Sequence, residues 1–148
     1  MPPPEDQPAR DLYEAIKNYL DRQHIWYNPV PRGAIEVPAV WRPYLGPPRL
    51  LYWDDLNDRA GALAFAHEFG HVLLHPPGSP DPGNGHVKES EERIVHAAAA
   101  ALWVHSGLTG YELGMTALGV PLGMLSPGDE ERPAADVLSQ EMINRLFS

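Results

Sequence analysis

The sequence predicts an α+β fold in which a small, mostly antiparallel sheet packs against several helices. Segments with helical periodicity lie near the start, in the middle and at the end, and a proline-rich stretch of short β-type runs separates the first from the others. The 148 residues, 43% of them hydrophobic, can bury one core but fall short of two full domains. We therefore expect 1–148 to be one domain, with 1–7 as a loose lead-in and 108–148 as its helical extension.

The first element is predicted to be a helix from Pro8 to about Gln23. Four apolar residues recur there at helical spacing, namely Leu12, Ile16, Tyr19 and Leu20. Short β-type runs follow at 26–27, 34–37, 40–41 and 50–53. Six prolines interrupt this stretch, and since proline cannot donate to a central ladder, we expect exposed strand edges.

The remaining elements are predicted to be helical. Helix-start residues at 54–58 precede a helix from Arg59 to about His75, which Pro76 and Pro77 end. An irregular loop at 78–87 leads to a second helix from about Ser90 to His105, which ends at Gly107. A short helix near 111–118, a Gly/Pro-rich loop and an amphipathic helix at about 134–147 complete the chain.

Composition excludes several classes of function. The chain has no cysteine, which rules out disulfides, Cys-based zinc fingers and a thiol nucleophile. Its net charge of −9 argues against direct nucleic-acid binding. No signal peptide and no apolar run of about 18 residues is visible, so we expect a cytoplasmic protein without membrane contact. With 7 His and no Cys, a bound metal would need imidazole and carboxylate ligands.

The motif that carries chemistry is His67-Glu68-x-x-His71, in the middle of the predicted helix. Residues four apart lie on one face of a helix, so both imidazoles can reach one cation. Zinc lowers the pKa of a bound water to about 7, and Glu68, beside the first ligand, is placed to accept its proton. The motif predicts a catalytic zinc site with Glu68 as general base.

A catalytic zinc site needs a third protein ligand, which the second helix can supply. Three glutamates compete there: Glu89, Glu91 and Glu92. Glu92 shares a face with His96 four residues later, so a ligand and a hydrogen-bonding partner could stack, whereas acidic residues nearer the helix start also complement its dipole. The spacing favours Glu92 and leaves Glu89 and Glu91 as alternatives.

One longer pattern runs through both helices: Arg59-x5-Phe65-Ala66-His67-Glu68-Phe69-Gly70-His71-Val72-Leu73-Leu74-His75, then Glu92-x-x-x-His96-Ala97-x-Ala99-Ala100-x-Leu102. It resembles the ImmA/IrrE-type zinc metallopeptidases, whose pattern is A-H-E-L-G-H-x-L-L-H and then E-x-x-A-N/D-x-F-A-x-x-L-L, over about residues 26–103. The resemblance implies a compact zincin-like fold, one Zn²⁺ per chain held by His67, His71 and Glu92, and Glu68 as general base. It further implies a cytoplasmic zinc metalloendopeptidase that cleaves a regulatory partner protein, such as a helix-turn-helix repressor.

The chain departs from that pattern in its second helix. His96 stands where the family has Asn or Asp, and Ala98 stands where it has Phe. A peptidase also needs a group that stabilises the oxyanion, and His86, His96 and Tyr111 are all candidates. These points keep an alternative function open, a non-catalytic zinc-binding or partner-binding regulatory module that retains the fold.

Two further features have a structural and a functional interpretation. His75 follows His71 by four residues, but Pro76 ends the helix there, so we expect capping or packing rather than metal ligation. The aromatic residues of the β-type stretch are expected to be mostly core rather than a substrate groove: Trp26, Tyr27, Trp41, Tyr44, Tyr52 and Trp53. An edge strand in this stretch could still hold an extended peptide by strand addition.

Overall fold

The computed structural model describes residues 7–43, 46–79 and 87–147, which form an α+β fold. Within these residues, the fold consists of five α-helices, two short 3-10 helices (η) and one three-stranded sheet. In chain order the elements are α1 (Gln7–Arg22), β1 (Trp26–Val30), η2 (Arg32–Ala34), β2 (Ala39–Arg42), β3 (Arg49–Trp53), α2 (Asp58–Leu74), α3 (Val87–His105), α4 (Tyr111–Ala117), η3 (Leu122–Met124) and α5 (Arg132–Phe147).

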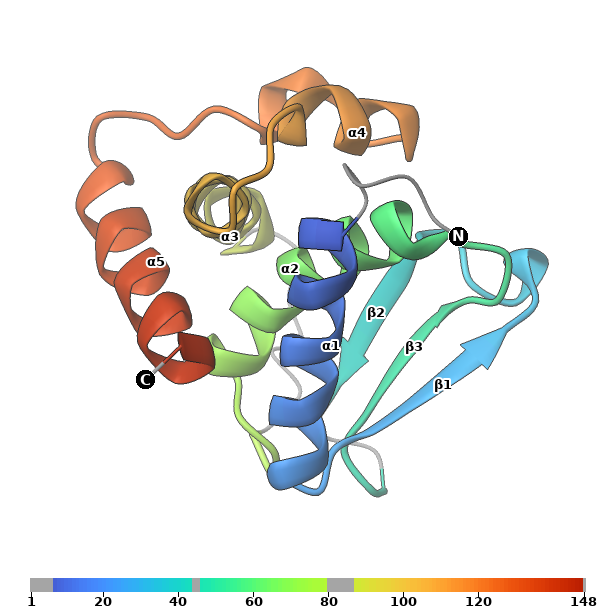
Figure 1. The fold of residues 1–148 in the computed structure, drawn as a ribbon. Helices are drawn as coiled ribbons and strands as arrows, with labels where there is room; N and C mark the ends of the chain where they lie inside the picture. Colours follow the sequence, from blue (N-terminus) through green and yellow to red (C-terminus); the bar gives the residue numbers. More distant parts are fainter. Residues whose placement is uncertain (1–6, 44–45, 80–86, 148) are drawn as a thin grey trace.

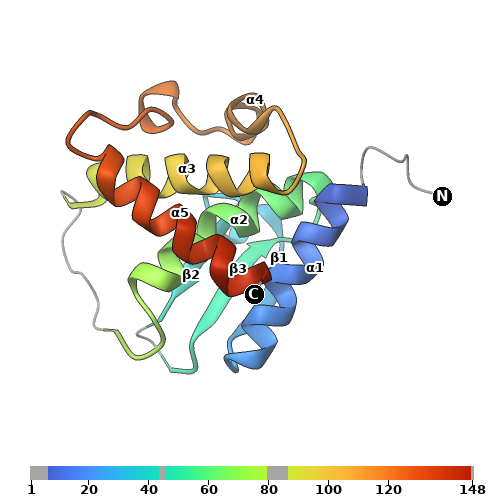
Figure 2. The same cartoon turned by 60° about the vertical axis from the view of Figure 1, so that its left-hand side comes forward.

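The helices lie on one side of the sheet (Figure 1). Helices α1 and α2 are next to the sheet, and α3 and α5 lie beyond α2. The view in Figure 2 shows α3 running alongside α2, with α5 crossing both and α4 above them. None of the helices in the described ranges is both long enough and apolar enough to cross a bilayer.

The sheet is mixed, which corrects the prediction of a mostly antiparallel one. Its order is β1-β3-β2, with β1 parallel and β2 antiparallel to β3. The run Leu50-Leu51-Tyr52-Trp53 of the central strand β3 contains no proline, as pairing on both sides requires, and Leu50 is fully buried. Pro29 instead lies in the edge strand β1, which accords with the expectation of proline at exposed edges.

The strand predicted at 34–37 does not form. The turn η2 occupies Arg32–Ala34, and the chain bends through the following residues up to Pro38. Pro38 favours an extended residue before it but offers no N–H to a ladder, so this short run cannot add a paired strand. The segment is held by other contacts, since the Trp53 indole donates a hydrogen bond to the Ile35 carbonyl at 3.0 Å.

Helix α2 is the centre of the fold. Its N-cap is Asn57, whose side chain accepts a hydrogen bond from the Ala60 amide at 2.8 Å, as the helix-start residues predicted. Most of its residues are buried, because α1, the sheet, α3 and α5 surround it. Phe65 and Phe69 are fully buried and make edge-to-face contacts with Tyr13 and Tyr19 of α1. This packing fixes the rotation of α2 and therefore the direction of its histidines.

Candidate metal centre

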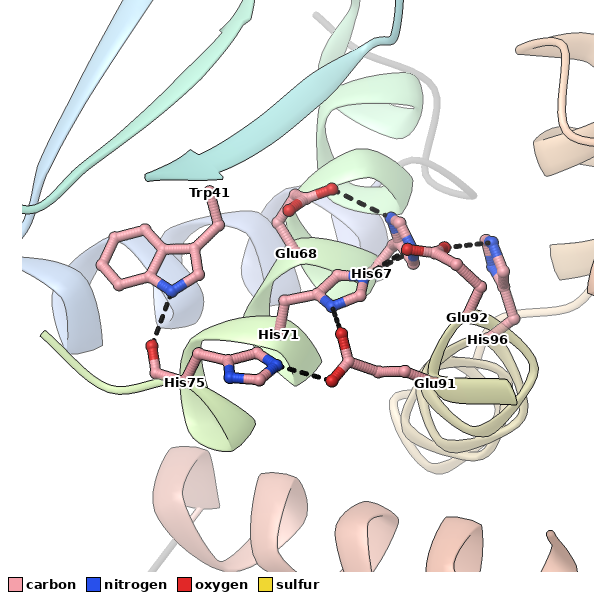
Figure 3. Close-up of polar contacts among 8 residues, drawn as sticks. All are labelled: Trp41, His67, Glu68, His71, His75, Glu91, Glu92 and His96. Atoms are coloured by element: carbon pink, nitrogen blue, oxygen red, sulfur yellow. Dashed lines mark hydrogen bonds and ion pairs between the residues drawn. The ribbon is translucent and has the colours of Figure 1, made fainter. Parts of the chain in front are cut away.

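His67 and His71 lie one turn apart on the same face of α2, as the motif predicted (Figure 3). Their Nε2 atoms are 3.3 Å apart, and their side chains are 14% and 11% exposed. In a tetrahedral zinc site with bonds of 2.0–2.1 Å, two ligand atoms are about 3.3 Å apart. The spacing of the two imidazole nitrogens therefore suits a zinc ion.

Helix α3 contributes the third donor. The Oε2 atom of Glu92 is 2.8 Å from His67 Nε2, and its Oε1 atom is 2.8 Å from His71 Nε2. Donor atoms of the three residues all lie within 4.8 Å of one another, so the cluster could hold a metal ion. The structure thus brings Glu92 to the Nε2 atoms of both histidines, while Glu89 is exposed and Glu91 contacts His71 at Nδ1 instead.

Gly70 allows α3 to come this close. A Cβ atom at position 70 would be 2.8 Å from Val95 Cγ1, tighter than carbon atoms approach in proteins. Ala98 and Ala99, about one turn after Val95 on α3, are small and fully buried. Gly70, which belongs to the quoted pattern, therefore sets the helix separation that brings Glu92 to the histidines.

Each histidine also has a carboxylate beside its second ring nitrogen. Glu68 Oε1 lies 3.1 Å from His67 Nδ1, and Glu91 Oε2 forms a 3.1 Å hydrogen bond with His71 Nδ1. A carboxylate at Nδ1 favours the tautomer that carries its proton there, which leaves the Nε2 lone pair free for a cation. Both imidazoles are arranged as metal-ligating histidines usually are.

The charges of the cluster also suit a cation. Burial lowers the pKa of His71, but Glu91 and Glu92 more than offset this effect and raise it to about 10. Burial likewise opposes protonation of His67, yet Glu68 and Glu92 raise its pKa overall. For Glu92, burial raises the pKa, and its bonds with the two histidines hold it far below its usual range. In the metal-free protein these groups hold protons between them, in the place where a cation would bind.

His96 packs against the cluster without joining it. Its ring stacks on His67 with centroids 4.1 Å apart and planes 7° apart, and its Nδ1 is 2.9 Å from the Tyr111 hydroxyl. Burial, together with the nearby His67, lowers the pKa of His96 to about 3, so its ring is neutral. Three residues are candidates for stabilising an oxyanion. His96 lines the pocket, but its Nε2 faces Glu92. The Tyr111 hydroxyl is engaged by His96, and His86 lies outside the described residues.

A pocket of about 490 Å³ opens in front of the cluster. Residues of β2 and of the segment before it form one wall, including Val37 and Trp41. Mainly apolar residues of α4 and the chain after it form another: Met115, Leu118, Gly119, Val120, Pro121 and Met124. Glu68 and the three clustered residues lie on its floor, so a ligand in the pocket would reach all of them.

The structure also places the other predicted residues. His75 caps the end of α2 and pairs with Glu91, outside the cluster. The expected aromatic core holds for Trp41 and Trp53, which are buried, and for Tyr27 and Tyr52, which pack against the core. Trp26 was expected with them but is 58% exposed, because it begins an edge strand, and Tyr44 lies outside the described residues.

Sequence reasoning missed the pocket wall after α4 and the contact between Glu91 and His71. The wall comes from a Gly/Pro-rich segment with no periodic pattern, so nothing in the sequence indicated where it would lie. A signal for Glu91 did exist, since it is adjacent to Glu92 on a helix that faces both histidines. No protein-family model, curated protein or solved structure matches this chain.

Proposed function

We propose that this chain is a zinc metalloendopeptidase of the zincin type, with one Zn²⁺ held by His67, His71 and Glu92. The observation that carries the proposal is the convergence of three donors within 4.8 Å on the floor of a pocket that also contains the Glu68 carboxylate. Three protein donors beside an open pocket are typical of catalytic zinc sites, whereas structural sites are closed by four ligands. Two imidazoles and a carboxylate are donors that zinc commonly takes.

When bound, zinc would supply Lewis acidity, which lowers the pKa of water and polarises a carbonyl group. Glu68 would then act as the general base. It accepts a proton as the oxygen of the attacking water bonds to the scissile carbonyl carbon, and it gives that proton to the amine nitrogen when the C–N bond breaks. Glu68 is suited to both transfers because it lines the pocket and is only 5% exposed.

The edge strand β2 suits a peptide substrate. Only β3 pairs with it in the described sheet, and Ala39, Val40 and Trp41 line the pocket. An extended peptide could add to this edge and cross the pocket above Glu68. We infer a protein substrate, such as a helix-turn-helix repressor in the cytoplasm, and with a net charge of −9 we expect the chain itself not to bind nucleic acid.

One observation favours a second function, a non-catalytic zinc-binding regulatory module. Glu68 Oε1 is 3.1 Å from His67 Nδ1, so the carboxylate could serve only to orient that ligand. In that case the pocket and the β2 edge would bind a partner protein without cleaving it.

Zinc content and peptide cleavage, measured for the wild type and three variants, separate the two functions. Glu68→Gln should retain one zinc per chain and lose cleavage of a peptide library by about 100- to 10,000-fold, the usual contribution of a general base. His71→Ala and Glu92→Ala should lose zinc as well as activity. Wild-type protein that holds one zinc per chain and cleaves no peptide would indicate the regulatory module, and full zinc affinity in Glu92→Ala would refute the third ligand.

A further inference from the structure

The Glu91 carboxylate bridges two histidines of α2. Its Oε2 atom forms a 3.1 Å hydrogen bond with His71 Nδ1, and its Oε1 atom forms one of 2.5 Å with His75 Nε2 (Figure 3). The Glu91 and His71 side chains are 20% and 11% exposed, so this contact is largely shielded from water. Shielding strengthens a hydrogen bond between a carboxylate and an imidazole.

The far end of the bridge is itself anchored. His75 is the C-cap of α2, and its carbonyl accepts a 2.7 Å hydrogen bond from the Trp41 indole of β2. A chain of contacts therefore leads from Trp41 of β2 through His75 and Glu91 to His71. Because Glu91 is held by two side chains of α2, and His75 is in turn fixed by Trp41, Glu91 has little freedom to leave His71 Nδ1.

Two consecutive residues of α3 thus contact the same imidazole from different directions. Glu92 approaches His71 at Nε2, the nitrogen turned towards His67, and Glu91 approaches at Nδ1. Orienting groups of this kind hold a ligand ring in place and keep the proton off the nitrogen that binds the metal.

We propose that Glu91 is a positioning residue of the metal centre, which orients His71 through Nδ1 and is itself held by His75. The inference rests on the proposed metal site but not on the proposed peptidase activity. It assigns a role to His75, which lies outside the cluster of donors, and to the second of the three neighbouring glutamates.

The test is the zinc affinity of the purified chain, measured by competition with a chromophoric chelator, together with the absorption spectrum of the Co²⁺ form. Glu91→Ala should bind zinc about 10- to 100-fold more weakly and shift the Co²⁺ bands, since the ring of His71 is no longer fixed. Glu91→Gln should retain most of the affinity, because its amide oxygen can accept from His71 and its NH₂ group can donate to His75. His75→Ala should show a smaller loss than Glu91→Ala, since the contact with His71 remains. The matched control is Glu89→Ala, an exposed glutamate two residues earlier on α3, which should bind zinc as the wild type does.

Equal affinity of Glu91→Ala and wild type would overturn the inference while leaving the metal site intact. An equal loss in Glu91→Gln and Glu91→Ala would also overturn it, because negative charge rather than orientation would then be responsible. The thermal unfolding midpoint of each metal-free variant serves as a check on folding. If Glu91→Ala lowers this midpoint and the zinc affinity but leaves the Co²⁺ bands unchanged, a general folding defect rather than a positioning role would explain the loss. A wild-type chain that binds no zinc would refute the metal centre itself, whereas one that binds zinc but cleaves no peptide would refute only the peptidase proposal.

Discussion

His96 lies parallel to His67, with the ring centroids 4.1 Å apart and an angle of 7° between the planes. The two residues belong to α3 and α2, so the stack is a direct contact between the helices that supply the candidate ligands. The His96 ring is also held by α4, because its Nδ1 is hydrogen-bonded with the Tyr111 hydroxyl at 2.9 Å. The stack and the hydrogen bond therefore connect α2, α3 and α4 beside the candidate ligands.

We expect His96 and Tyr111 to be energetically coupled. Both side chains are buried, so His96→Phe, which keeps a ring against His67, leaves the tyrosine hydroxyl without its partner, and Tyr111→Phe leaves the imidazole nitrogen without its own. Each substitution should destabilise the metal-free protein by about 1–3 kcal/mol. The double variant should lose less than the sum of the two, as measured by urea unfolding in a double-mutant cycle. Strict additivity would show that the hydrogen bond contributes nothing to stability.

The close approach of α2 and α3 gives a second prediction. Gly70→Ala should place a Cβ atom against Val95 Cγ1 and move the helices apart, with a loss of about 1–3 kcal/mol from overpacking and weaker zinc binding as Glu92 withdraws. Adding Val95→Ala removes the clashing methyl group and should restore part of the zinc affinity.

Gly33→Ala is the matched control for that series, because nothing lies within 4 Å of a Cβ at position 33. It should change the free energy of unfolding by no more than about 0.5 kcal/mol. Unchanged zinc affinity in Gly70→Ala would contradict the conclusion that this glycine determines the separation of the ligand-bearing helices.

The part of the site that depends on local geometry could be predicted from sequence. His67 and His71 share a face because four residues make about one helical turn, whatever surrounds the helix. Glu92 could be favoured over its neighbours by spacing and by the resemblance. In the structure the favoured residue, Glu92, is the glutamate that forms the cluster of donors with the two histidines.

The part that depends on long-range contacts could not be predicted. The strand β3 pairs with β1 in parallel because the chain passes from β1 to the far edge before it returns to the centre, and nothing within any one strand encodes that path. Glu36 and Val37 looked like part of a strand, but they line the pocket instead. Their place is determined by Pro38 and by the hydrogen bond from the Trp53 indole to the Ile35 carbonyl, a contact between residues 18 positions apart in the sequence.

The ion pair of Glu131 with Arg93 predicts a specific pH dependence of stability. Hydrogen bonds from Arg93 and Ser90 and from the Gly128 amide lower the pKa of Glu131 from 4.5 to about 2. Since the folded-state pKa is the lower one, the stabilisation is fully present above about pH 4.5 and is lost as the pH falls towards 2.

Urea unfolding of wild type and Glu131→Gln at several pH values tests this dependence. The difference in free energy of unfolding between the two should be constant from pH 7 to about 5, shrink between pH 4.5 and 2, and level off below that. Glu130→Gln changes the exposed neighbour and should behave as the wild type throughout. A difference that does not change with pH would show that the Glu131 carboxylate gains nothing from its partners.

Zinc should stabilise the folded chain, and the substitution of a proposed ligand should reduce this stabilisation. A metal that binds only the folded chain stabilises it by about 4 kcal/mol when its free concentration is 1,000 times the dissociation constant. Zinc added to chelator-treated wild type, or to Glu68→Gln, should therefore raise the unfolding midpoint, and His71→Ala should respond far less. The quantity to compare is the increment that zinc causes in each variant, because His71→Ala also removes one imidazole partner from each of Glu91 and Glu92 and so changes the metal-free baseline. An increment in His71→Ala as large as that of the wild type would place the zinc at other residues of the chain.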